Sequence, residues 1–517
     1  MLNTTSNTPF ASLLAALRAH PANDIAVIAP EQSLTYAELV SHIIAFSRQL
    51  DSAKISAFAL QSSNSLAWLI ADLAAHCSDR LIVPVPDFFT ELQKQHLFES
   101  SQIKHLLTDE TALQSKPFAY DLNVLSIETE GEINCPTGTQ KITFTSGSTG
   151  SPKGVCLSKE NQLNVAQSLA TTINAATVLN NSTTINNSSN SDKAKHLCLL
   201  PFSTLLENIA GIYAVLLSGG TVVIASDEQR GFKGSKLINP HALLTAISST
   251  QPNTLILVPE LLKLLVTASK QGWQAPSSLT FIAVGGAKVD GQLISQAHTL
   301  GLPVYQGYGL SEAGSVVALN THIIEGNNAA GELLAHSKVS IENGEVIIHS
   351  NLFLGYLGEP ESWYPTRFAT GDLGELNGNS LQLSGRRKNL IINAFGRNIS
   401  PEWPESLLDA TGAFMQVVVL GDGYPALTAV AFPFAPLSDE QLQGCLALVN
   451  QHLPDYAQIA HIFVLSSPIS AINGCTTANG KFIRPAIEHA FKQHLDTYFN
   501  QAAHFAHPQL DATAKLA

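Results

Sequence analysis

The sequence has few charged residues and no extended basic run. Only 13% of its 517 residues are charged, and 28 Lys and Arg stand against 41 Asp and Glu, which gives a formal net charge of −13. Binding of nucleic acid depends on clustered Lys and Arg that neutralise phosphates. The composition therefore argues against nucleic acid as a partner.

Long apolar runs are also missing. No stretch of about 18 apolar residues, the length needed to cross a bilayer, occurs in the chain. Residues 1–20 lack the basic start and apolar core of a secretion signal. Six cysteines show neither the spacing of a zinc site nor a disulfide framework: Cys77, Cys135, Cys156, Cys198, Cys445 and Cys475. We therefore expect a cytoplasmic protein without a transmembrane segment.

Apolar residues, by contrast, are abundant. Hydrophobic residues make up 45% of the chain, and its 517 residues exceed what one core usually supports, so we expect at least two domains. Strand-like and helix-like segments alternate over residues 57–109, which predicts α/β layers with parallel strands. Thr35 followed by Glu38 predicts a capping box at a helix start. Residues 180–191 are almost wholly Asn, Ser and Thr, which predicts a mobile surface insertion.

The most informative stretch is Lys141–Gly154. Polar and apolar residues alternate over Lys141–Thr145 as in a strand, and a loop rich in glycine and hydroxyl side chains follows. Exposed backbone N–H groups, hydroxyls and a lysine suit phosphate oxygens. A flexible Ser/Gly linker is the alternative, but the loop leads into the β-prone run Val155–Ser158. We therefore predict phosphate contacts from these residues: Thr145, Ser146, Gly147, Ser148, Thr149, Gly150 and Lys153.

Two later strands end in motifs that suit a nucleotide base. Phe281–Val284 is followed by small residues, among them Gly286 and Ala287, which permit a planar base to approach the backbone. A tight turn would use the same residues. The strand at 303–305 leads to Gly307–Glu312, a second motif of this kind.

The Gly307–Glu312 motif combines an aromatic ring with oxygen ligands. Tyr308, beside Gly309, can stack on adenine. The hydroxyl of Ser311 and the carboxylate of Glu312 can hold phosphate and Mg²⁺. The motif predicts a magnesium ligand at Glu312.

Three further motifs lie nearer the C-terminus. Asp372, on a predicted glycine-flanked turn, can accept hydrogen bonds from both ribose hydroxyls. Arg386 lies in a basic cluster before a strand, and Gly396 lies in the turn that follows. Lys481 lies on a glycine-containing loop before an amphipathic helix that begins at Pro485. In isolation, such residues are most simply parts of a turn or of a solvated face.

Taken in order, these motifs resemble the signatures of the acyl-adenylate-forming (AMP-binding) enzyme superfamily, with AMP-forming acyl-CoA synthetases closest in pattern. The resemblance covers nearly the whole chain. It implies an α/β fold, with a large N-terminal domain of stacked sheets and helices over residues 1–387. It also implies a small mobile α+β domain over residues 388–517, with the active site between the two.

The resemblance implies a role for each motif. The loop at 145–153 would hold the β- and γ-phosphates, and Glu312 with Mg²⁺ would hold the departing pyrophosphate. Asp372 would bind the ribose, and Arg386 would reach the nucleotide. Lys481 would contact the α-phosphate and the substrate carboxylate. The implied catalytic residues are Lys481, Glu312 and Ser311, and the implied nucleotide and CoA contacts are Thr145, Ser146, Gly147, Ser148, Thr149, Gly150, Lys153, Gly286, Ala287, Tyr308, Gly309, Asp372, Arg386 and Gly396.

The implied function is activation of a fatty or related carboxylic acid with ATP and Mg²⁺, followed by transfer to the thiol of CoA. Thr204 stands where fatty-acid-activating relatives often have His, and Phe395 stands where relatives often have Gly in the loop that CoA passes. Transfer to an acyl carrier protein is therefore the main alternative. A non-catalytic nucleotide-binding homologue is the third, which the presence of Glu312, Asp372 and Lys481 disfavours. No Asp lies between residues 199 and 216 to hold an α-amino group, which disfavours an amino acid substrate.

Overall fold

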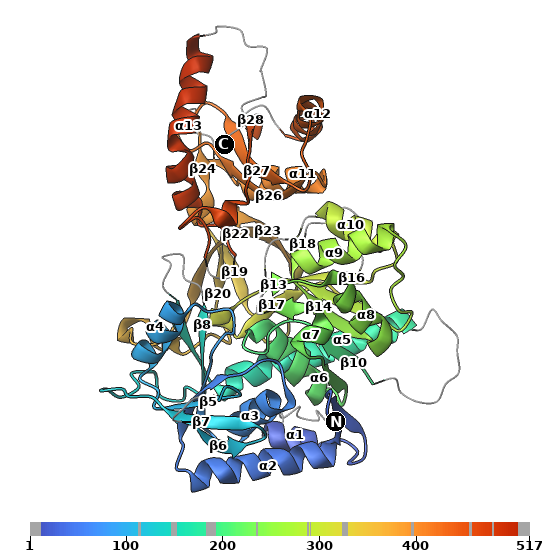
Figure 1. The fold of residues 1–517 in the computed structure, drawn as a ribbon, viewed down its shortest axis with the longest axis vertical. Coiled ribbons are helices and arrows are strands. Elements are labelled where there is room, and N and C mark those ends of the chain that lie inside the picture. Colours follow the sequence, from blue (N-terminus) through green and yellow to red (C-terminus); the bar gives the residue numbers. More distant parts are fainter. Residues whose placement is uncertain are drawn as a thin grey trace, which may run out of the picture.

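The protein is described by a computed structural model that covers residues 12–111, 115–145, 152–181, 193–233, 236–286, 289, 291–322, 329–393, 398–453, 457–477 and 480–504. A large N-terminal part carries a smaller C-terminal part (Figure 1). Both contain helices packed on sheets, so the predicted α/β fold class is confirmed. Among the described residues, no helix is both long and apolar enough to span a bilayer.

Within the described residues, the largest sheet has thirteen strands. Its middle strands β14, β15 and β16 pair in parallel, as do β1, β10 and β11. In spatial order the strands are β19 (Val339–Glu342), β20 (Glu345–Ile348), β22 (Phe368–Asn377), β23 (Ser380–Arg386), β18 (Ala329–Leu333), β17 (Ser315–Leu319), β16 (Val304–Leu310), β15 (Phe281–Val284), β14 (Thr254–Leu257), β10 (Lys195–Cys198), β11 (Thr221–Ile224), β1 (Ile25–Ile28) and β2 (Ser33–Thr35).

A second sheet of the large part has eight strands among the described residues. It contains the strands on both sides of the predicted phosphate loop. In spatial order they are β21 (Gly355–Tyr356), β9 (Lys153–Leu157), β8 (Lys141–Thr145), β4 (Leu81–Pro84), β3 (Ala57–Gln61), β5 (His105–Thr108), β7 (Leu122–Ser126) and β6 (Lys116–Ala119). Strands β3, β4 and β5 are parallel, as the alternating pattern at 57–109 predicts. A separate short pair is β12 (Phe232–Lys233) with β13 (Lys236–Leu237).

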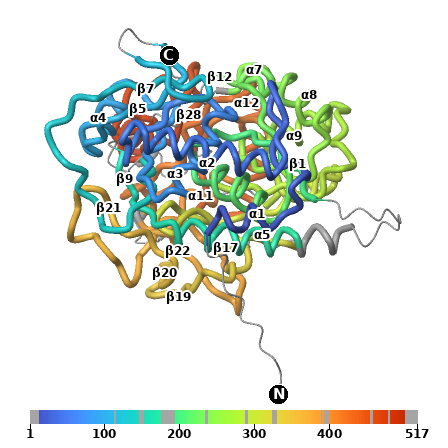
Figure 2. The backbone as a smooth tube through the Cα atoms, turned by 90° about the horizontal axis from the view of Figure 1, so that it is seen from below, coloured from blue at the N-terminus to red at the C-terminus, as the bar shows by residue number. Residues whose placement is uncertain are grey.

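Helices cover these sheets, and in the view from below α1, α2 and α3 lie across the large part (Figure 2). The helices of the large part are α1 (Leu13–Ala19), α2 (Tyr36–Ser52), α3 (Leu66–Cys77), α4 (Glu91–Ser101), α5 (Lys159–Asn181), α6 (Ala214–Leu217), α7 (Asp227–Arg230), α8 (Pro240–Thr250), α9 (Pro259–Lys270) and α10 (Gly291–Thr299), with the π-helix η1 (Leu206–Tyr213) and the 3₁₀ turns η2 (Ser311–Ala313), η3 (Pro360–Ser362) and η4 (Arg387–Asn389). Asn180 and Asn181 of the predicted insertion end α5, and residues 182–191 lie outside the described residues.

The predicted capping box is confirmed at the start of α2. The Thr35 hydroxyl accepts from the Glu38 backbone N–H at 3.2 Å, and the Glu38 carboxylate accepts from the Thr35 backbone N–H at 2.8 Å. These reciprocal bonds satisfy two backbone donors that a helix start leaves free.

The smaller part is built on one three-stranded sheet. Its elements are β24 (Ile391–Ile392), β25 (Asn398–Ile399), α11 (Glu402–Ala410), β26 (Phe414–Leu420), β27 (Leu427–Pro433), α12 (Asp439–Asn450), β28 (Ile459–Val464), η6 (Ile469–Ala471) and α13 (Arg484–His504). Val417 and Val419 join the core beneath α11 and α12, while Val418 joins the core beneath α13. The predicted amphipathic helix is thus confirmed as α13, which packs on its own sheet. Lys263 on α9 meets Asp409 on α11 at 3.4 Å and links the two parts.

Two segments bury polar groups that the sequence pattern does not mark. The alternation at Lys141–Thr145 marks a real strand, but β8 is buried on both faces, and Lys141 pairs with Asp72 at 2.8 Å with both side chains 1% exposed. The apolar run from Leu205 is a π-helix followed by a short α-helix, and it buries the polar residues Glu207 and Asn208. In both places a buried polar group has a partner far away in the sequence, so local pattern does not reveal it.

Candidate active site

The two ends of the predicted phosphate loop lie side by side. Thr145 ends β8, Lys153 begins β9, and the two residues are antiparallel register partners. His96 on α4 donates a hydrogen bond to the Pro152 carbonyl at 3.0 Å and fixes the end of the loop. Ser146, Gly147, Ser148, Thr149 and Gly150 lie outside the described residues, so their phosphate contacts stay predictions.

Lys153 is half-exposed and lies among groups that sequence reasoning missed. Its ammonium donates to both carboxylate oxygens of Glu359, at 2.8 and 3.2 Å. The same ammonium lies 4.8 Å from the ring centroid of Tyr356. Because Lys153 and Glu359 are accessible, a phosphate can replace Glu359 as the partner of this lysine. No local signal in the sequence marks Glu359, which is 206 residues away.

Glu312 lies in the turn η2, directly after β16. The hydroxyl of Tyr356 donates to its carboxylate at 2.8 Å, and the backbone N–H of Phe353 donates to its carbonyl at 2.7 Å. Neighbouring Ser311 is half-buried, as Glu312 is. A half-buried carboxylate with one oxygen already oriented by a hydroxyl is a hard oxygen ligand of the kind Mg²⁺ prefers.

Asp372 lies in a different setting from the predicted exposed turn. It is a residue of β22, only 5% exposed, and faces Arg386 across the β22–β23 ladder. Tyr308 donates to its carboxylate at 2.7 Å, and Arg386 Nε donates at 2.7 Å. Burial, and then the Asp372 charge, raise the pKa of the Tyr308 hydroxyl, which stays protonated and donates. A folded core therefore holds the predicted ribose acceptor in place before any ligand arrives.

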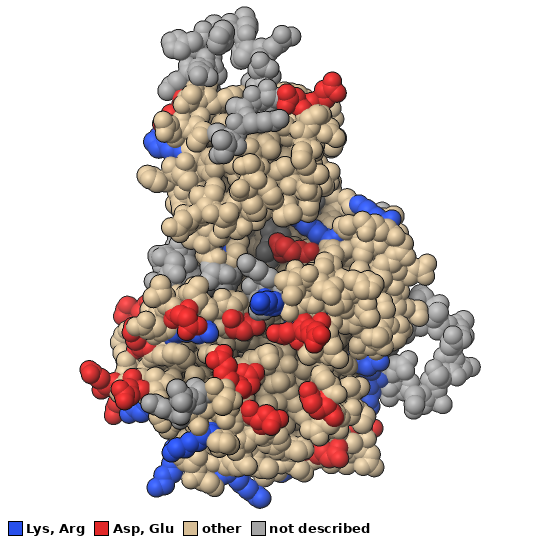
Figure 3. Space-filling model, viewed as in Figure 1, with Lys and Arg blue, Asp and Glu red and all other residues tan. Residues whose placement is uncertain are grey.

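Lys481 approaches the same place from the small domain. It follows Gly480, whose φ of +74° suits glycine, and its carbonyl accepts from the Thr477 N–H at 2.8 Å. Although the side chain is solvent-accessible, desolvation and then the positive charge of Arg386 lower its pKa. The two cations are therefore within electrostatic range of each other. The surface between the large and the small part is hollowed (Figure 3).

The glycines of the base-binding motifs have distinct settings. Gly286 follows β15 with φ of +81°, and a Cβ there would lie 3.8 Å from Leu206 and from Val258. At Gly309 a Cβ would lie 1.8 Å from the Ser315 carbonyl oxygen, so β16 and β17 pack closely only with glycine at this position. The predicted contacts Ala287 and Gly396 lie outside the described residues, as does Phe395.

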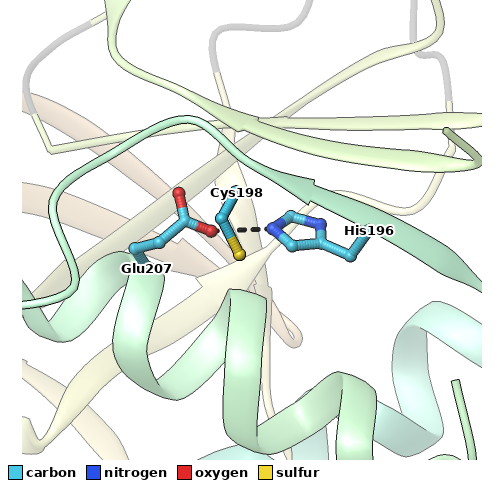
Figure 4. A group of neighbouring side chains, drawn as sticks. All are labelled: His196, Cys198 and Glu207. Atoms are coloured by element: carbon cyan, nitrogen blue, oxygen red, sulfur yellow. Dashed lines mark hydrogen bonds and ion pairs between the residues drawn. The ribbon is translucent and has the colours of Figure 1, made fainter. Parts of the chain in front are cut away.

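A buried cluster that sequence reasoning missed lies inside the large domain (Figure 4). His196 donates to one Glu207 oxygen at 2.7 Å, and the Leu200 N–H donates to the other at 2.8 Å. Cys198 lies beside them, and burial raises the pKa of its thiol well above the usual value. Two ligand atoms of one tetrahedral metal ion would lie about 3.3 Å apart. The 2.7 Å between the His196 nitrogen and the Glu207 oxygen is shorter and fits a direct hydrogen bond. The cluster is therefore a hydrogen-bonded anchor for the chain at Leu200, where β10 has just ended.

Comparison with known proteins gives one family match. The family model described as AMP-binding enzyme matches residues 13–356. Among curated proteins, the 2-succinylbenzoate–CoA ligase of Bacillus licheniformis is 24% identical over 420 residues, covering 74% of this chain and 80% of the relative. The ligase of the same name from Bacillus subtilis is 26% identical over 435 residues, covering 77% and 82%.

Solved structures show the same fold. The o-succinylbenzoate CoA synthetase of Bacillus subtilis with its acyl-adenylate intermediate has a TM-score of 0.71 at 21% identity, covering 92% of this chain and 98% of that one. An anthranilate CoA ligase with anthranoyl-AMP has a TM-score of 0.75 at 14% identity, covering 95% and 99%. These similarities confirm the predicted arrangement of a large N-terminal and a small C-terminal domain.

Proposed function

Because the chain belongs to the AMP-binding enzyme family, we propose that it is an AMP-forming ligase that activates a carboxylic acid with ATP and transfers the acyl group to CoA. The family assignment predicted from the motifs is confirmed by the match over residues 13–356. The observations that carry the proposal are the Asp372 carboxylate, which Tyr308 and Arg386 orient, and the Glu312 carboxylate, which Tyr356 links to Lys153.

The reaction has two steps. A carboxylate oxygen attacks the α-phosphorus of ATP, the bond to the β-phosphate bridge breaks, and acyl-adenylate and pyrophosphate form. The thiol of CoA then attacks the acyl carbon, loses its proton, and releases AMP. Negative charge grows on phosphate oxygens in the first step, so fixed donors and cations are needed where it develops. Lys481 would serve the α-phosphate, Lys153 the outer phosphates, and Asp372 the ribose.

The residues around Glu312 fit a magnesium ion. Mg²⁺ is commonly held by one or two carboxylates together with substrate phosphates, and Glu312 offers such an oxygen beside the strand that starts at Lys153. When bound, the ion would neutralise phosphate charge. Glu312 would hold it, and Ser311 would lie next to it.

We propose an aromatic acid of the type named for the relatives, 2-succinylbenzoate or anthranilate, as the first candidate substrate. The fatty acid expected from motif pattern has no support among these relatives. Thr204, which replaces the His of fatty-acid-activating relatives, is half-buried and donates its hydroxyl to the Pro201 carbonyl at 2.7 Å. It therefore caps the turn before η1 and leaves a shorter side chain there than His would.

We also propose two alternative functions, a domain boundary and a location. An acyl carrier protein could replace CoA as the acceptor, and a non-catalytic nucleotide-binding protein could keep the same scaffold. The domain boundary is proposed between residues 387 and 388, inside η4. A cytoplasmic location is proposed because all six cysteines are free thiols.

The test is a panel of acids assayed for pyrophosphate release, with and without CoA. The panel contains 2-succinylbenzoate, anthranilate, benzoate and fatty acids of several lengths, and Lys481→Ala is the control for contaminating activity. We expect release that depends on an aromatic acid and becomes multiple-turnover with CoA. Release with fatty acids alone would overturn the substrate class. Release unaffected by CoA would favour the carrier protein, and no release with any acid would favour the non-catalytic alternative.

A further inference from the structure

The segment 351–356 wraps around Glu312. Asn351 donates its side-chain amide to the Ala313 carbonyl at 3.4 Å, and the Phe353 N–H donates to the Glu312 carbonyl at 2.7 Å. The segment ends with Tyr356, whose hydroxyl donates to the Glu312 carboxylate at 2.8 Å. Both the backbone and the side chain of the predicted metal ligand are therefore held by this one segment.

Tyr356 also reaches the strand that leaves the phosphate loop. It lies in β21, which pairs antiparallel with β9, and its register partner is Val155. The Lys153 ammonium lies 4.8 Å from the centre of its ring. A cation at this distance over a tyrosine ring is attracted to the negative face of the ring. One side chain thus contacts both the predicted metal ligand and the predicted phosphate lysine.

Tyr356 is itself fixed from several sides. Its N–H donates to the Ser362 hydroxyl at 2.8 Å, and its carbonyl accepts from the Trp363 indole at 2.9 Å. Its ring meets the Phe353 ring edge to face, with centroids 4.9 Å apart. A side chain held in this way can orient its neighbours without ordering itself when the ligand binds.

We propose that Tyr356 is a positioning residue that aims Glu312 at the metal and Lys153 at the phosphates of bound Mg–ATP, an inference that rests on the proposed function. A hydrogen bond to one carboxylate oxygen leaves the other oxygen directed at the ion, and such outer partners typically contribute about 10–100-fold to metal affinity.

Two substitutions distinguish the contribution of the Tyr356 hydroxyl from that of its ring. Tyr356→Phe removes the hydrogen bond to Glu312 and keeps the ring over Lys153, whereas Tyr356→Leu removes both. The matched control is Tyr364→Phe, because Tyr364 is 54% exposed and its hydroxyl donates to the Thr137 carbonyl at 3.3 Å. Melting temperatures verify that each variant is folded.

The readout is ATP affinity by calorimetry over a series of Mg²⁺ concentrations, without acid or CoA. Tyr356→Phe should raise the Mg²⁺ concentration for half-maximal tightening of ATP binding by about tenfold. It should leave ATP affinity in EDTA unchanged. Tyr356→Leu should weaken ATP binding in EDTA as well, because Lys153 loses the ring. Tyr364→Phe should match the wild type in both.

A double-mutant cycle with Glu312 distinguishes the proposed role of Tyr356 from an indirect effect on folding. In a Glu312→Gln background, Tyr356→Phe should change the Mg²⁺ requirement by less than about twofold, because the two residues act as a unit. The inference about Tyr356 would be overturned, with the proposed function intact, by either of two results. One is a Tyr356→Phe variant with wild-type Mg²⁺ dependence, and the other is an equal effect of Tyr356→Phe in the wild-type and Glu312→Gln backgrounds. A wild-type protein that does not bind Mg–ATP would overturn the proposed function together with the inference.

Discussion

Arg386 donates to Asp372 and lowers the pKa of Lys481 through its charge, but the protein supports Asp372 and Lys481 in opposite ways. Asp372 is 5% exposed in a long strand and already accepts hydrogen bonds from Tyr308 and Arg386. Lys481 is an exposed residue on a loop of the small domain. In the proposed function, the large domain offers a fixed acceptor for the nucleotide, and the small domain offers a cation on an exposed loop. Binding and chemistry are therefore expected to respond separately to mutation.

The largest expected effect is that of Lys481→Ala on adenylate formation. Loss of one preorganised transition-state donor typically costs about 10²–10³-fold in rate. Thioester formation from supplied acyl-adenylate should change far less, because in the proposed mechanism the lysine serves only the first step. Both half-reactions are measured on the purified variant after its melting temperature is verified. Equal losses in the two steps would contradict a separate role for the small-domain cation.

Asp372→Ala should weaken ATP binding by about tenfold to a hundredfold, since charge-assisted hydrogen bonds are worth about 1.5–3 kcal/mol. The substitution should also lower the melting temperature, because Tyr308 and Arg386 lose a buried acceptor. Calorimetry and thermal unfolding check the two effects. Glu375→Ala, on the exposed face of the same strand, is the control. An Asp372→Ala variant with unchanged ATP affinity would remove this residue from the ribose site.

The smallest expected effect is a gain. Glu359→Gln should tighten ATP binding by about two- to fivefold, because the exposed Lys153 no longer has to leave the Glu359 carboxylate before it binds phosphate. The gain should shrink at high salt, where exposed charges are screened. Glu361→Gln removes the same charge two residues away, at an exposed position, and should leave the affinity unchanged. Equal gains from both variants would indicate a general charge effect instead.

Local signals in the sequence predicted much of the fold. The capping box at Thr35, the strands around the phosphate loop and the amphipathic helix after Pro485 all depend on neighbours a few residues apart. The family assignment followed from the order of the motifs. These features could be predicted because period and capping chemistry are encoded within single segments.

What the sequence could not reveal are contacts between distant segments. Lys141 reads as the polar side of a strand, yet it pairs with buried Asp72 and bonds Asn208. Asp372 reads as a turn residue, yet neighbouring strands bury it. Tyr356 holds Glu312 across 44 positions. Each of these contacts depends on which segments pack together in the fold, and the spacing of residues along the chain does not determine that.

Mass spectrometry of the reaction mixture shows whether the protein forms an acyl-adenylate. The purified protein is incubated with 2-succinylbenzoate, ATP and Mg²⁺ without CoA, beside the Lys481→Ala variant. We expect an acid–AMP adduct with the wild type, which disappears in favour of the CoA thioester when CoA is added. Absence of any adduct across the acid panel, from a folded protein that binds Mg–ATP, would contradict the proposed function.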